Sequence, residues 1–305
     1  MPAKTPLLVC LVGPTAIGKT TMAIAIARAF SSAIISADSR QFFKEMTIGT
    51  AVPSVDELAS VPHYFIQNKS IFEAYNVGDF EREALDTLSQ LFKEHSVLVM
   101  AGGSGLYVDA VVKGLDNFPE VPVEIRDQLN KEFKEEGISA LQTALKKADP
   151  LYYEQADIHN QHRVIRALEI YRASGKPFSS FLRKEQPERP FNTLYVGLSA
   201  ERSIIYDRIN MRVDEMIHAG LIEEAKALYE YKELNALQTV GYRELFLYFD
   251  GKISKETAIE EIKKNTRRFA KRQGTWFRKN ENIHWFEHTV DPKEIIHFIK
   301  EKGTL

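Results

Sequence analysis

The sequence predicts an α/β fold, with a P-loop NTPase-like core on a parallel sheet, an inserted all-helical domain and a helical C-terminal region. Three observations support this fold class. Between residues 7 and about 112, short apolar runs suited to buried strands alternate with stretches of helical period. A glycine-bearing turn at 13–20 joins the first strand pattern to the first helix pattern. From 115 to 190 only helical patterns remain, between two proline-bearing links.

The composition is that of a globular protein of 305 residues, 44% hydrophobic and 27% charged. The net charge of −2 means that affinity for nucleic acid has to come from local basic patches. The single cysteine, Cys10, excludes an internal disulfide or a cysteine zinc site, and its apolar neighbours predict a small core residue. The sequence shows no signal-peptide pattern and no apolar stretch of about 18 residues. We therefore expect a cytoplasmic protein with no membrane partner.

The first unit of the chain is a strand, a phosphate-binding turn and a helix. Residues 7–12, LLVCLV, predict a buried strand, and the alanine-rich residues 20–30 predict a helix. The turn between them matches the P-loop template G-x-x-x-x-G-K-[ST], whose backbone N–H groups and helix N-terminus attract phosphate. We expect Lys19 to supply positive charge to the phosphates and the Thr20 hydroxyl to hold Mg²⁺. The predicted diphosphate- or nucleotide-binding residues are Gly13, Pro14, Thr15, Ala16, Ile17, Gly18, Lys19 and Thr20.

The α/β pattern continues with three further segments. Residues 32–38 form a β-branched run that ends in an acid, and 61–67 is also strand-like. Residues 96–112 read as a second strand, glycine turn and helix. Between them, 77–95 predicts an amphipathic helix whose apolar face comprises Phe80, Ala84, Leu88 and Leu91.

The change of pattern defines the expected domains. We expect a helical insertion at 115–190, within an α/β core with C-terminal helices formed by 1–114 and 191–305. Residues 191–199 return to a strand pattern. The rest of the chain is expected to be helical, with segments at 201–220, 221–231 and 254–279.

An acid near the phosphate loop decides between hydrolysis and other chemistry. Hydrolysing P-loop enzymes carry an acid at a strand end to order Mg²⁺, but the strand pattern at 97–101 runs into Gly102 and Gly103. The available acid is Asp38, beyond the strand pattern at 32–38, where α/β sheets bind ligands. Asp38 would then coordinate Mg²⁺ or act as a general base. The alternative is a turn or helix cap, since Asp-Ser is good capping chemistry.

The segment 263–279 is strongly basic, and no acid occurs from 262 to 280. Because like charges at four-residue spacing destabilise a helix, their accumulation favours an anionic ligand such as an RNA backbone over a solvated face. As a helix, the segment places Ile259, Ile262, Phe269 and Trp276 on one apolar seam. Three arginines at 201–220 are further candidates to clamp phosphate: Arg202, Arg208 and Arg212.

Two other residue patterns carry less weight. The histidine pairs His159/His162 and His284/His288 lack nearby carboxylate or cysteine partners, so we expect no metal site at either. Tyr152 and Tyr153 are able to stack on a base, but packing between helices is the favoured interpretation.

In this order the segments resemble the tRNA dimethylallyltransferases (isopentenyl transferases) of bacterial type. The resemblance spans nearly the whole chain. It rests on GPTAIGKT (13–20), DSRQFFKEMTIGTAVP (38–53), PH (62–63), DF (79–80), GGSGLY (102–107), HRVIRALE (162–169), RINMRVDEM (208–216), VGYRE (240–244) and TRRFAKRQGTWFR (266–278).

The resemblance implies an enzyme that moves a dimethylallyl group from dimethylallyl diphosphate to N6 of the adenosine 3′ of the anticodon (position 37) in tRNA, releasing pyrophosphate. It implies Mg²⁺ as cofactor. No protein partner is required, and although the sequence is silent on oligomeric state, we expect a monomer because one RNA per monomer suffices. Asp38 would take the proton from N6, while Lys19, Thr20 with Mg²⁺, and Arg212 would stabilise the departing pyrophosphate. The adenine would have to leave its stack.

By the same resemblance, the helical insertion would grip the anticodon stem-loop. The implied tRNA-binding residues are Asp38, Ser39, Arg40, Gln41, Ser104, Arg126, His162, Arg163, Val164, Ile165, Arg166, Gly241, Arg243, Lys271, Arg272, Gln273, Trp276 and Arg278.

The chain departs from the family pattern at five positions. Ile17 stands in place of serine, Phe43 of tyrosine, Val52 of lysine, Ser104 of threonine and His162 of glutamine or another polar residue. Three other functions remain as alternatives: a P-loop small-molecule kinase, an adenylate isopentenyltransferase and a non-catalytic RNA-binding protein. The basic segment and the helical insertion argue against the first two, and the intact P-loop argues against the third.

Overall fold

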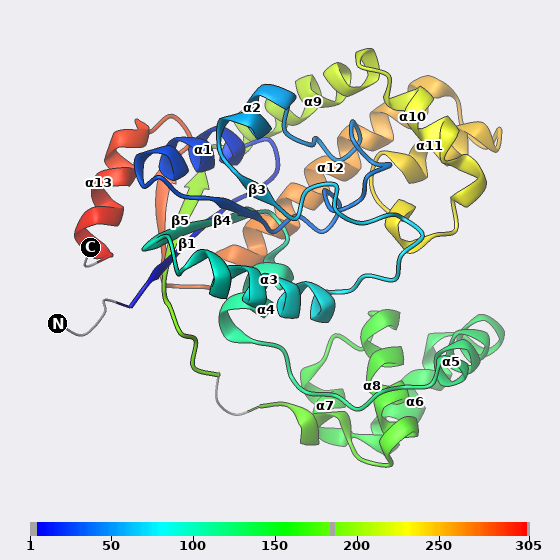
Figure 1. The fold of residues 1–305 in the computed structure, drawn as a ribbon. Helices are drawn as coiled ribbons and strands as arrows, with labels where there is room; N and C mark the ends of the chain where they lie inside the picture. Colours follow the sequence, from blue (N-terminus) through cyan, green and yellow to red (C-terminus); the bar gives the residue numbers. More distant parts are fainter. Residues whose placement is uncertain (1–4, 184–186, 304–305) are drawn as a thin grey trace. The chain divides into compact units, whose positions relative to one another are not determined.

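The computed structural model describes residues 5–183 and 187–303. The chain divides into two compact units, one formed by 1–113 with 188–305 and the other by 114–187 (Figure 1). We call them the catalytic unit and the helical unit. The link expected at 184–190 lies partly outside the described residues. Within the described part of the chain, no helix is both long and apolar enough to cross a membrane.

The catalytic unit is built on one six-stranded sheet, as the alternating strand and helix patterns predicted. Every pair of neighbouring strands is parallel, in the order β3-β2-β4-β1-β5-β6. The central strand β1 pairs with β4 on one side and β5 on the other. The strands are β1 (Leu7–Val12), β2 (Ile34–Ser36), β3 (His63–Tyr64), β4 (Val97–Gly102), β5 (Asn192–Ser199) and β6 (Ile283–Glu287).

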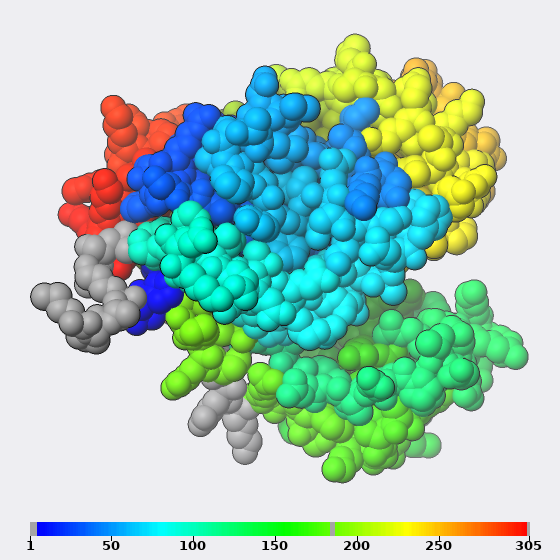
Figure 2. All heavy atoms as spheres, viewed as in Figure 1, coloured from blue at the N-terminus to red at the C-terminus, as the bar shows by residue number. Residues whose placement is uncertain are grey.

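Both faces of the sheet are buried, which explains why β1 is apolar at every position. On one face Leu8, Cys10 and Val12 pack with residues of α3 (Val77–Leu91) and α4 (Gly105–Lys113). The residues between them, Leu7, Val9 and Leu11, pack on the other face with α1 (Lys19–Ala29) and α13 (Pro292–Lys302). In Figure 2 the red atoms of α13 lie beside the blue atoms of α1. Cys10 is a core residue as predicted, and burial raises the pKa of its thiol.

A third buried cluster joins the helices beyond the sheet. Its residues include Met46, Val213, Tyr242, Leu245 and Ile262. These helices are α9 (Arg202–His218), α10 (Leu221–Ala227), α11 (Tyr242–Phe249) and α12 (Lys255–Phe277). A short helix, α2 (Val55–Ser60), begins at a capping box formed by Ser54 and Glu57.

Two expectations about the C-terminal part were wrong. The remainder of the chain is not all helical, because Ile283–Glu287 forms the edge strand β6 beside β5. The apolar seam of α12 is also only half correct. Ile262 is buried and Ile259 packs against it, whereas Phe269 is 38% exposed and Trp276 40% exposed.

The helical unit has its own apolar core, with Leu129, Leu141, Val164 and Leu168 at its centre. Tyr152 packs on Phe178 at a ring-centroid distance of 4.5 Å, in agreement with the packing interpretation. Its helices are α5 (Val123–Glu136), α6 (Ile138–Ala148), α7 (Pro150–Gln155) and α8 (Gln161–Ser174).

Candidate active site

The P-loop adopts a conformation that few residue types tolerate. Gly13 and Gly18 have positive φ angles of 150° and 105°, and Ala16 has φ of 63°. A Cβ on Gly13 would lie 2.7 Å from the carbonyl oxygen of Leu198, so glycine is required there. Gly18 caps α1 without a side-chain hydrogen bond, which leaves the N–H groups of the first helical turn for an anion.

Lys19 folds back over the loop that precedes it. Its Nζ donates to the carbonyl oxygens of Gly13 at 3.0 Å and Pro14 at 2.7 Å. Desolvation by burial lowers the pKa of Lys19 to about 7, although the charge of Asp38 acts in the opposite direction. The positive charge of Arg212 lowers it further. Lys19 is therefore held where a phosphate would bind, and an incoming anion would stabilise its charged form.

Two arginines of α9 reach the same cavity, four residues apart on one face as predicted. Arg208 donates from Nε to the carbonyl oxygen of Ala16 at 2.7 Å, which stabilises the left-handed turn of the loop. Burial, followed by the charge of Arg208, lowers the pKa of Arg212. Arg202 lies outside this cavity, in a neighbouring one that Lys271 and Arg278 also line, and it donates to the Tyr206 hydroxyl at 2.7 Å.

Asp38 lies two residues beyond β2, at the carboxyl edge of the sheet. Its Oδ1 accepts the backbone N–H of Arg40 at 3.0 Å, so the turn interpretation is correct for one oxygen. Asp38 also lines two cavities, as expected for a residue that meets a ligand. The two roles are compatible, since a carboxylate accepts several hydrogen bonds.

Two cavities meet at Asp38. The first, of about 310 Å³, is lined by the P-loop, Arg208, Arg212 and Glu57. The second, of about 330 Å³, is lined by residues of α9, α11, α12 and the turn at 238–241. Their shared lining residues are Thr15, Asp38, Thr50, Ala51 and Arg212. The arrangement allows a group bound in one cavity to react with a group bound in the other.

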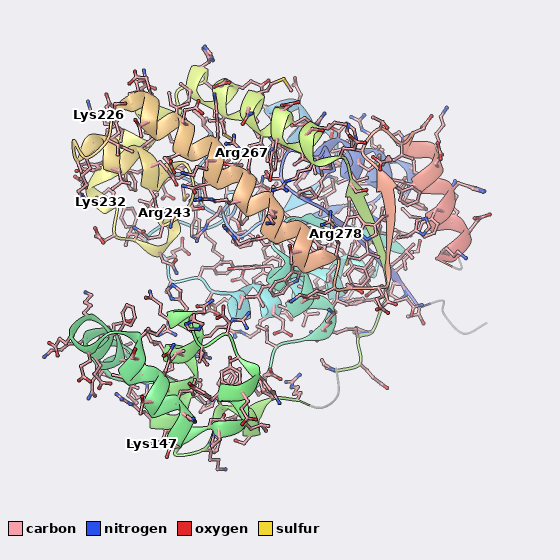
Figure 3. The ribbon with its side chains drawn as sticks, turned by 180° about the vertical axis from the view of Figure 1, so that it is seen from behind. Lys147, Lys226, Lys232, Arg243, Arg267 and Arg278 are labelled. Carbon is pink, nitrogen blue, oxygen red and sulfur yellow. The ribbon has the colours of Figure 1, made fainter. Side chains whose placement is uncertain are left out.

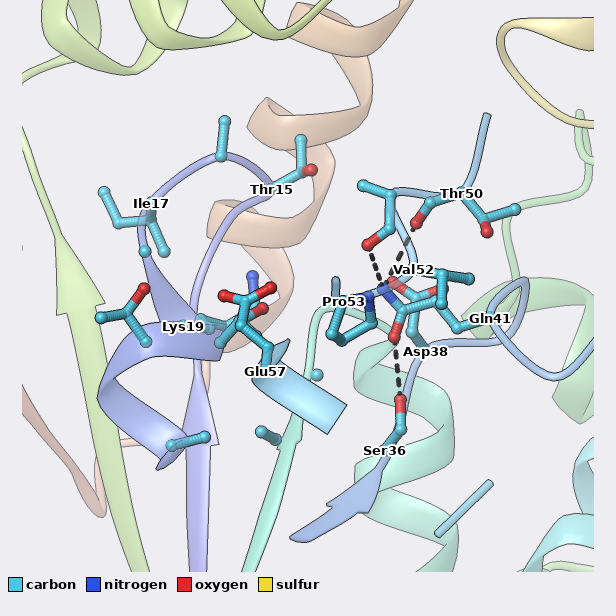
Figure 4. A pocket seen from close by; sticks show the side chains of 18 of the residues that line it. Thr15, Ile17, Lys19, Ser36, Asp38, Gln41, Thr50, Val52, Pro53 and Glu57 are labelled. Carbon is cyan, nitrogen blue, oxygen red and sulfur yellow. Dashed lines mark hydrogen bonds between the residues drawn. The ribbon is translucent and has the colours of Figure 1, made fainter. Parts of the chain in front are cut away.

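Gln41 links β2 to the loop that precedes α2. Its Nε2 donates to the carbonyl oxygens of Thr50 and Ala51, and its Oε1 accepts the Ser36 hydroxyl at 3.1 Å (Figure 4). Figure 4 also shows Lys19 and Glu57 directed into the first cavity. Sequence reasoning missed Glu57, although the Ser54–Glu57 capping box marked its helix.

The loops around Asp38 are tied to distant parts of the catalytic unit. Ser104 accepts the backbone N–H of Ser39 at 3.0 Å through its hydroxyl, which explains why serine serves here as well as threonine. Arg40 donates to the carbonyl oxygens of Asn235 and Ala236 at 3.0 and 3.1 Å. The departures at Ile17 and Phe43 are buried apolar side chains, so Ile17 offers phosphate only its backbone.

The second cavity continues onto a basic surface. Gly241, Arg243 and Arg272 line the cavity. Beyond it, a surface hollow on α12 is lined by Arg268, Lys271, Arg272, Thr275, Trp276 and Lys279. Figure 3 shows Arg267 and Arg278 along α12, with Arg243 beside the same helix. The remaining predicted residues line this cavity, the hollow on α12 or the cavity between α9 and α12: Arg243, Lys271, Arg272, Trp276 and Arg278. Gln273, in contrast, is buried.

The predicted residues of the helical unit fall into two groups. Val164 and Ile165 are buried in its apolar core, so their side chains are not available to a ligand. Arg126 and Arg166 are half-exposed and both bind the buried carboxylate of Glu169, Arg126 at 2.6 and 2.9 Å. His162 and Arg163 lie in the exposed first turn of α8, whose cap is Asn160.

No group of three or more His, Cys, Asp or Glu residues that could hold a metal ion occurs in the described ranges. His284, in the unexpected strand β6, stacks on Phe298 with ring centroids 4.3 Å apart.

Comparison with known proteins assigns the family. The sequence model of the family described as IPP transferase matches residues 41–280. The tRNA dimethylallyltransferase of Christiangramia forsetii is 60% identical over 97% of this chain and 98% of its own length. That of Flavobacterium johnsoniae is 55% identical over 96% of this chain and 97% of its own length.

Solved structures agree with the sequence comparison. The crystal structure of the tRNA isopentenylpyrophosphate transferase of Bacillus halodurans superposes with a TM-score of 0.73, at 37% identity, over 98% of this chain and 97% of the other. A eukaryotic dimethylallyltransferase acting on tRNA shares the fold, with a TM-score of 0.81 at 24% identity, over 98% of this chain and 80% of the other. The chain therefore belongs to the IPP transferase family.

Proposed function

We propose that the protein transfers a dimethylallyl group from dimethylallyl diphosphate to N6 of the adenosine at position 37 of tRNA and releases pyrophosphate. The observation that carries the proposal is the pair of cavities that meet at Asp38 and Arg212. One cavity is lined by residues 15–20 of the P-loop, and the other opens toward basic residues of α12. This geometry suits a small diphosphate donor and a nucleic-acid acceptor that approach one another from different sides.

The first cavity stabilises the leaving group. When the allylic C–O bond breaks, its electron pair stays on the diphosphate, so negative charge grows there. Lys19, Arg208, Arg212 and the N–H groups at the start of α1 surround this position. Because the groups are already in place, they stabilise the growing charge with little reorganisation.

A divalent metal ion fits the same cavity. The Thr20 hydroxyl and the carboxylates of Asp38 and Glu57 all line it, and oxygen ligands are those that Mg²⁺ prefers. We propose Mg²⁺ as the cofactor, held by Thr20. Bound there, it would neutralise charge on the diphosphate.

The second cavity presents the acceptor to Asp38. N6 of adenine is a weak nucleophile because its lone pair is delocalised into the ring. As the bond from N6 to the allylic carbon forms, N6 loses a proton, and the Asp38 carboxylate accepts it. The adenine has to leave its stack to reach the cavity, as in other enzymes that modify bases.

Basic residues on both units supply the electrostatic affinity for tRNA. On the catalytic unit these are Arg243, Lys271, Arg272 and Arg278, and on the helical unit Arg126, Arg163 and Arg166. Phosphate contacts of this kind fix position and weaken with salt. We propose that the helical unit grips the anticodon stem-loop and that a monomer in the cytoplasm suffices.

The test is transfer to unmodified tRNA, followed by mass spectrometry of the nucleosides. Wild-type protein with Mg²⁺ and dimethylallyl diphosphate should add one dimethylallyl group to adenosine 37. Asp38→Asn keeps the acceptor for Arg40 N–H but removes the base, so kcat should fall by about 10²- to 10⁴-fold. The rates are compared at saturating Mg²⁺ and dimethylallyl diphosphate, because Asp38 lines the metal cavity and its charge raises the pKa of Lys19. The matched control is Asp86→Asn, on the exposed face of α3.

The outcomes separate the proposal from its alternatives. If Asp38→Asn transferred the allyl group at the wild-type rate, Asp38 would have only its structural role in the turn. Phosphate transfer from ATP without an allyl adduct would indicate a kinase. Allyl transfer to free adenylate but not to tRNA would indicate an adenylate isopentenyltransferase.

A further inference from the structure

Gln273 occupies an unusual position in α12. It is 6% exposed, although residues beside it in the helix are basic and exposed. Its Oε1 accepts the backbone N–H of Thr15 at 2.8 Å, and its Nε2 donates to the carbonyl oxygen of Gly103 at 3.0 Å. One side chain therefore bridges the P-loop and the glycine turn after β4, which are distant from it in sequence.

The contact with the glycine turn is close enough to determine residue type. A Cβ on Gly103 would lie 2.2 Å from Nε2 of Gln273, so any larger residue would displace the amide from this position. One turn further along α12, Trp276 lies against Gly105 and donates from Nε1 to Asp109 Oδ2 at 2.9 Å. The end of α12 is thus fixed to the glycine turn at two places, and Gln273 extends this attachment to the P-loop.

The glutamine amide offers the hydrogen-bonding groups that its two neighbours require. A P-loop N–H and a strand-end carbonyl need an acceptor and a donor, and glutamine offers both. Both Oε1 and Nε2 of the Gln273 amide form hydrogen bonds. Turning the side chain outward would exchange these bonds for bonds to water, with no gain in free energy. A direct contact with RNA would break both bonds, whereas the exposed Lys271 and Arg272 are already on the surface.

We propose that Gln273 is a positioning residue for the phosphate loop and not a contact for tRNA. The proposal rests on the function proposed above, since it concerns the same diphosphate cavity. Thr15 lines both cavities, so its orientation affects the donor and the place where donor and acceptor meet. Without Gln273 the Thr15 N–H loses its acceptor and the loop loses its fixed distance from the glycine turn.

The experiment measures the two ligands separately. Calorimetry gives the Kd of inorganic pyrophosphate with Mg²⁺, and filter binding gives the Kd of unmodified tRNA. Gln273→Met retains the length of the side chain but can form neither bond. It should weaken pyrophosphate binding about 10-fold, the effect of losing hydrogen bonds of ordinary strength, and leave the Kd of tRNA within about twofold. The matched variant Lys271→Met should show the reverse pattern, weaker tRNA and unchanged pyrophosphate.

A second variant protects the test against a folding defect. In Gln273→Glu, a protonated carboxylic acid can accept from Thr15 N–H and donate to the Gly103 carbonyl, whereas the carboxylate cannot donate. Its pyrophosphate affinity relative to wild type should therefore recover as pH falls through the pKa of the introduced carboxyl. Thermal unfolding of each variant reports whether it is folded.

Weaker tRNA binding with unchanged pyrophosphate binding in Gln273→Met would overturn the proposal, as would a Gln273→Glu ratio that stays constant while the introduced carboxyl titrates. Because pyrophosphate binding needs no allyl transfer, these results remain interpretable if the proposed reaction fails. In that case an unchanged Kd of tRNA and weaker pyrophosphate binding would still assign Gln273 to the phosphate loop and not to tRNA.

Discussion

The low pKa of Lys19 predicts that diphosphate binding depends on pH in a particular direction. The ammonium is already bonded to two carbonyl oxygens of its own loop, and burial lowers its pKa to about 7. A bound diphosphate favours the charged form, so binding draws a proton onto Lys19 wherever the free group is neutral. Affinity should be highest below pH 7 and fall as pH rises.

The magnitude follows from the fraction of protein that is protonated. With a pKa of about 7, roughly 90% of Lys19 is charged at pH 6 and roughly 1% at pH 9. If only the charged form binds well, the Kd of pyrophosphate rises about 100-fold over this range. Calorimetry in buffers of different ionisation enthalpy should also show uptake of close to one proton near pH 8 to 9.

Pyrophosphate itself titrates in this range, so the assay needs a matched variant. Lys19→Arg keeps its charge throughout, because a guanidinium does not lose its proton in proteins. Its affinity will be lower, since the fork of the guanidinium does not fit the place of an ammonium, but its pH dependence reports the ligand alone. A wild-type curve that runs parallel to that of Lys19→Arg would refute the reasoning.

Three further predictions concern groups that shape the site. Glu224 accepts three backbone N–H groups of the turn at 47–49 and the Tyr242 hydroxyl, so Glu224→Ala should destabilise the protein by about 1–3 kcal/mol in urea unfolding. Glu169→Gln, which weakens the bond of a buried carboxylate to two arginines, should reduce amide protection in the helical unit and leave the catalytic unit unchanged. Arg208→Met frees the carbonyl of Ala16 and should raise the Kd of pyrophosphate about 3- to 10-fold in calorimetry.

The features that could be predicted from the sequence are those that the local sequence pattern determines. The P-loop needs left-handed residues at Gly13 and Gly18, and these leave a fixed spacing in the sequence. The apolar runs of β1 and β4 are continuous because both faces of the sheet are covered. Asp38 was identifiable because it follows a strand, and its turn bond was identifiable because Asp-Ser favours caps.

The contacts that link distant segments could not be predicted in this way. Gln273, Glu57 and Glu224 act on loops elsewhere in the chain, and no periodicity indicates which loop each one meets. A motif also does not show which of its residues face the core and which face a ligand. Val164 and Ile165 lie within a segment expected to bind RNA, yet they face the core of the helical unit.

The edge strand β6 shows a second limit. Its sequence, IHWFE, is short and only Ile283 is buried, so the hydrophobic pattern is too weak to distinguish a strand from a loop or helix end. The strand forms because β5 offers a free edge beside it, with Tyr195 opposite Ile283. Tertiary context, rather than local preference, decides such elements.

The end of β4 explains why this P-loop is suited to transfer rather than hydrolysis. Hydrolysing P-loop enzymes place an acid at a strand end to order Mg²⁺ and the attacking water. Here a Cβ on Gly102 would lie 2.2 Å from the carbonyl oxygen of Ala37, and the space beside Gly103 is filled by Gln273. A carboxylate at Gly102 would collide with backbone, so the acids of this cavity come from other segments, Asp38 from beyond the neighbouring strand β2 and Glu57 from α2. Asp38 lies where the two cavities meet, and in the proposed reaction it takes a proton from an amine instead of directing water at a phosphate.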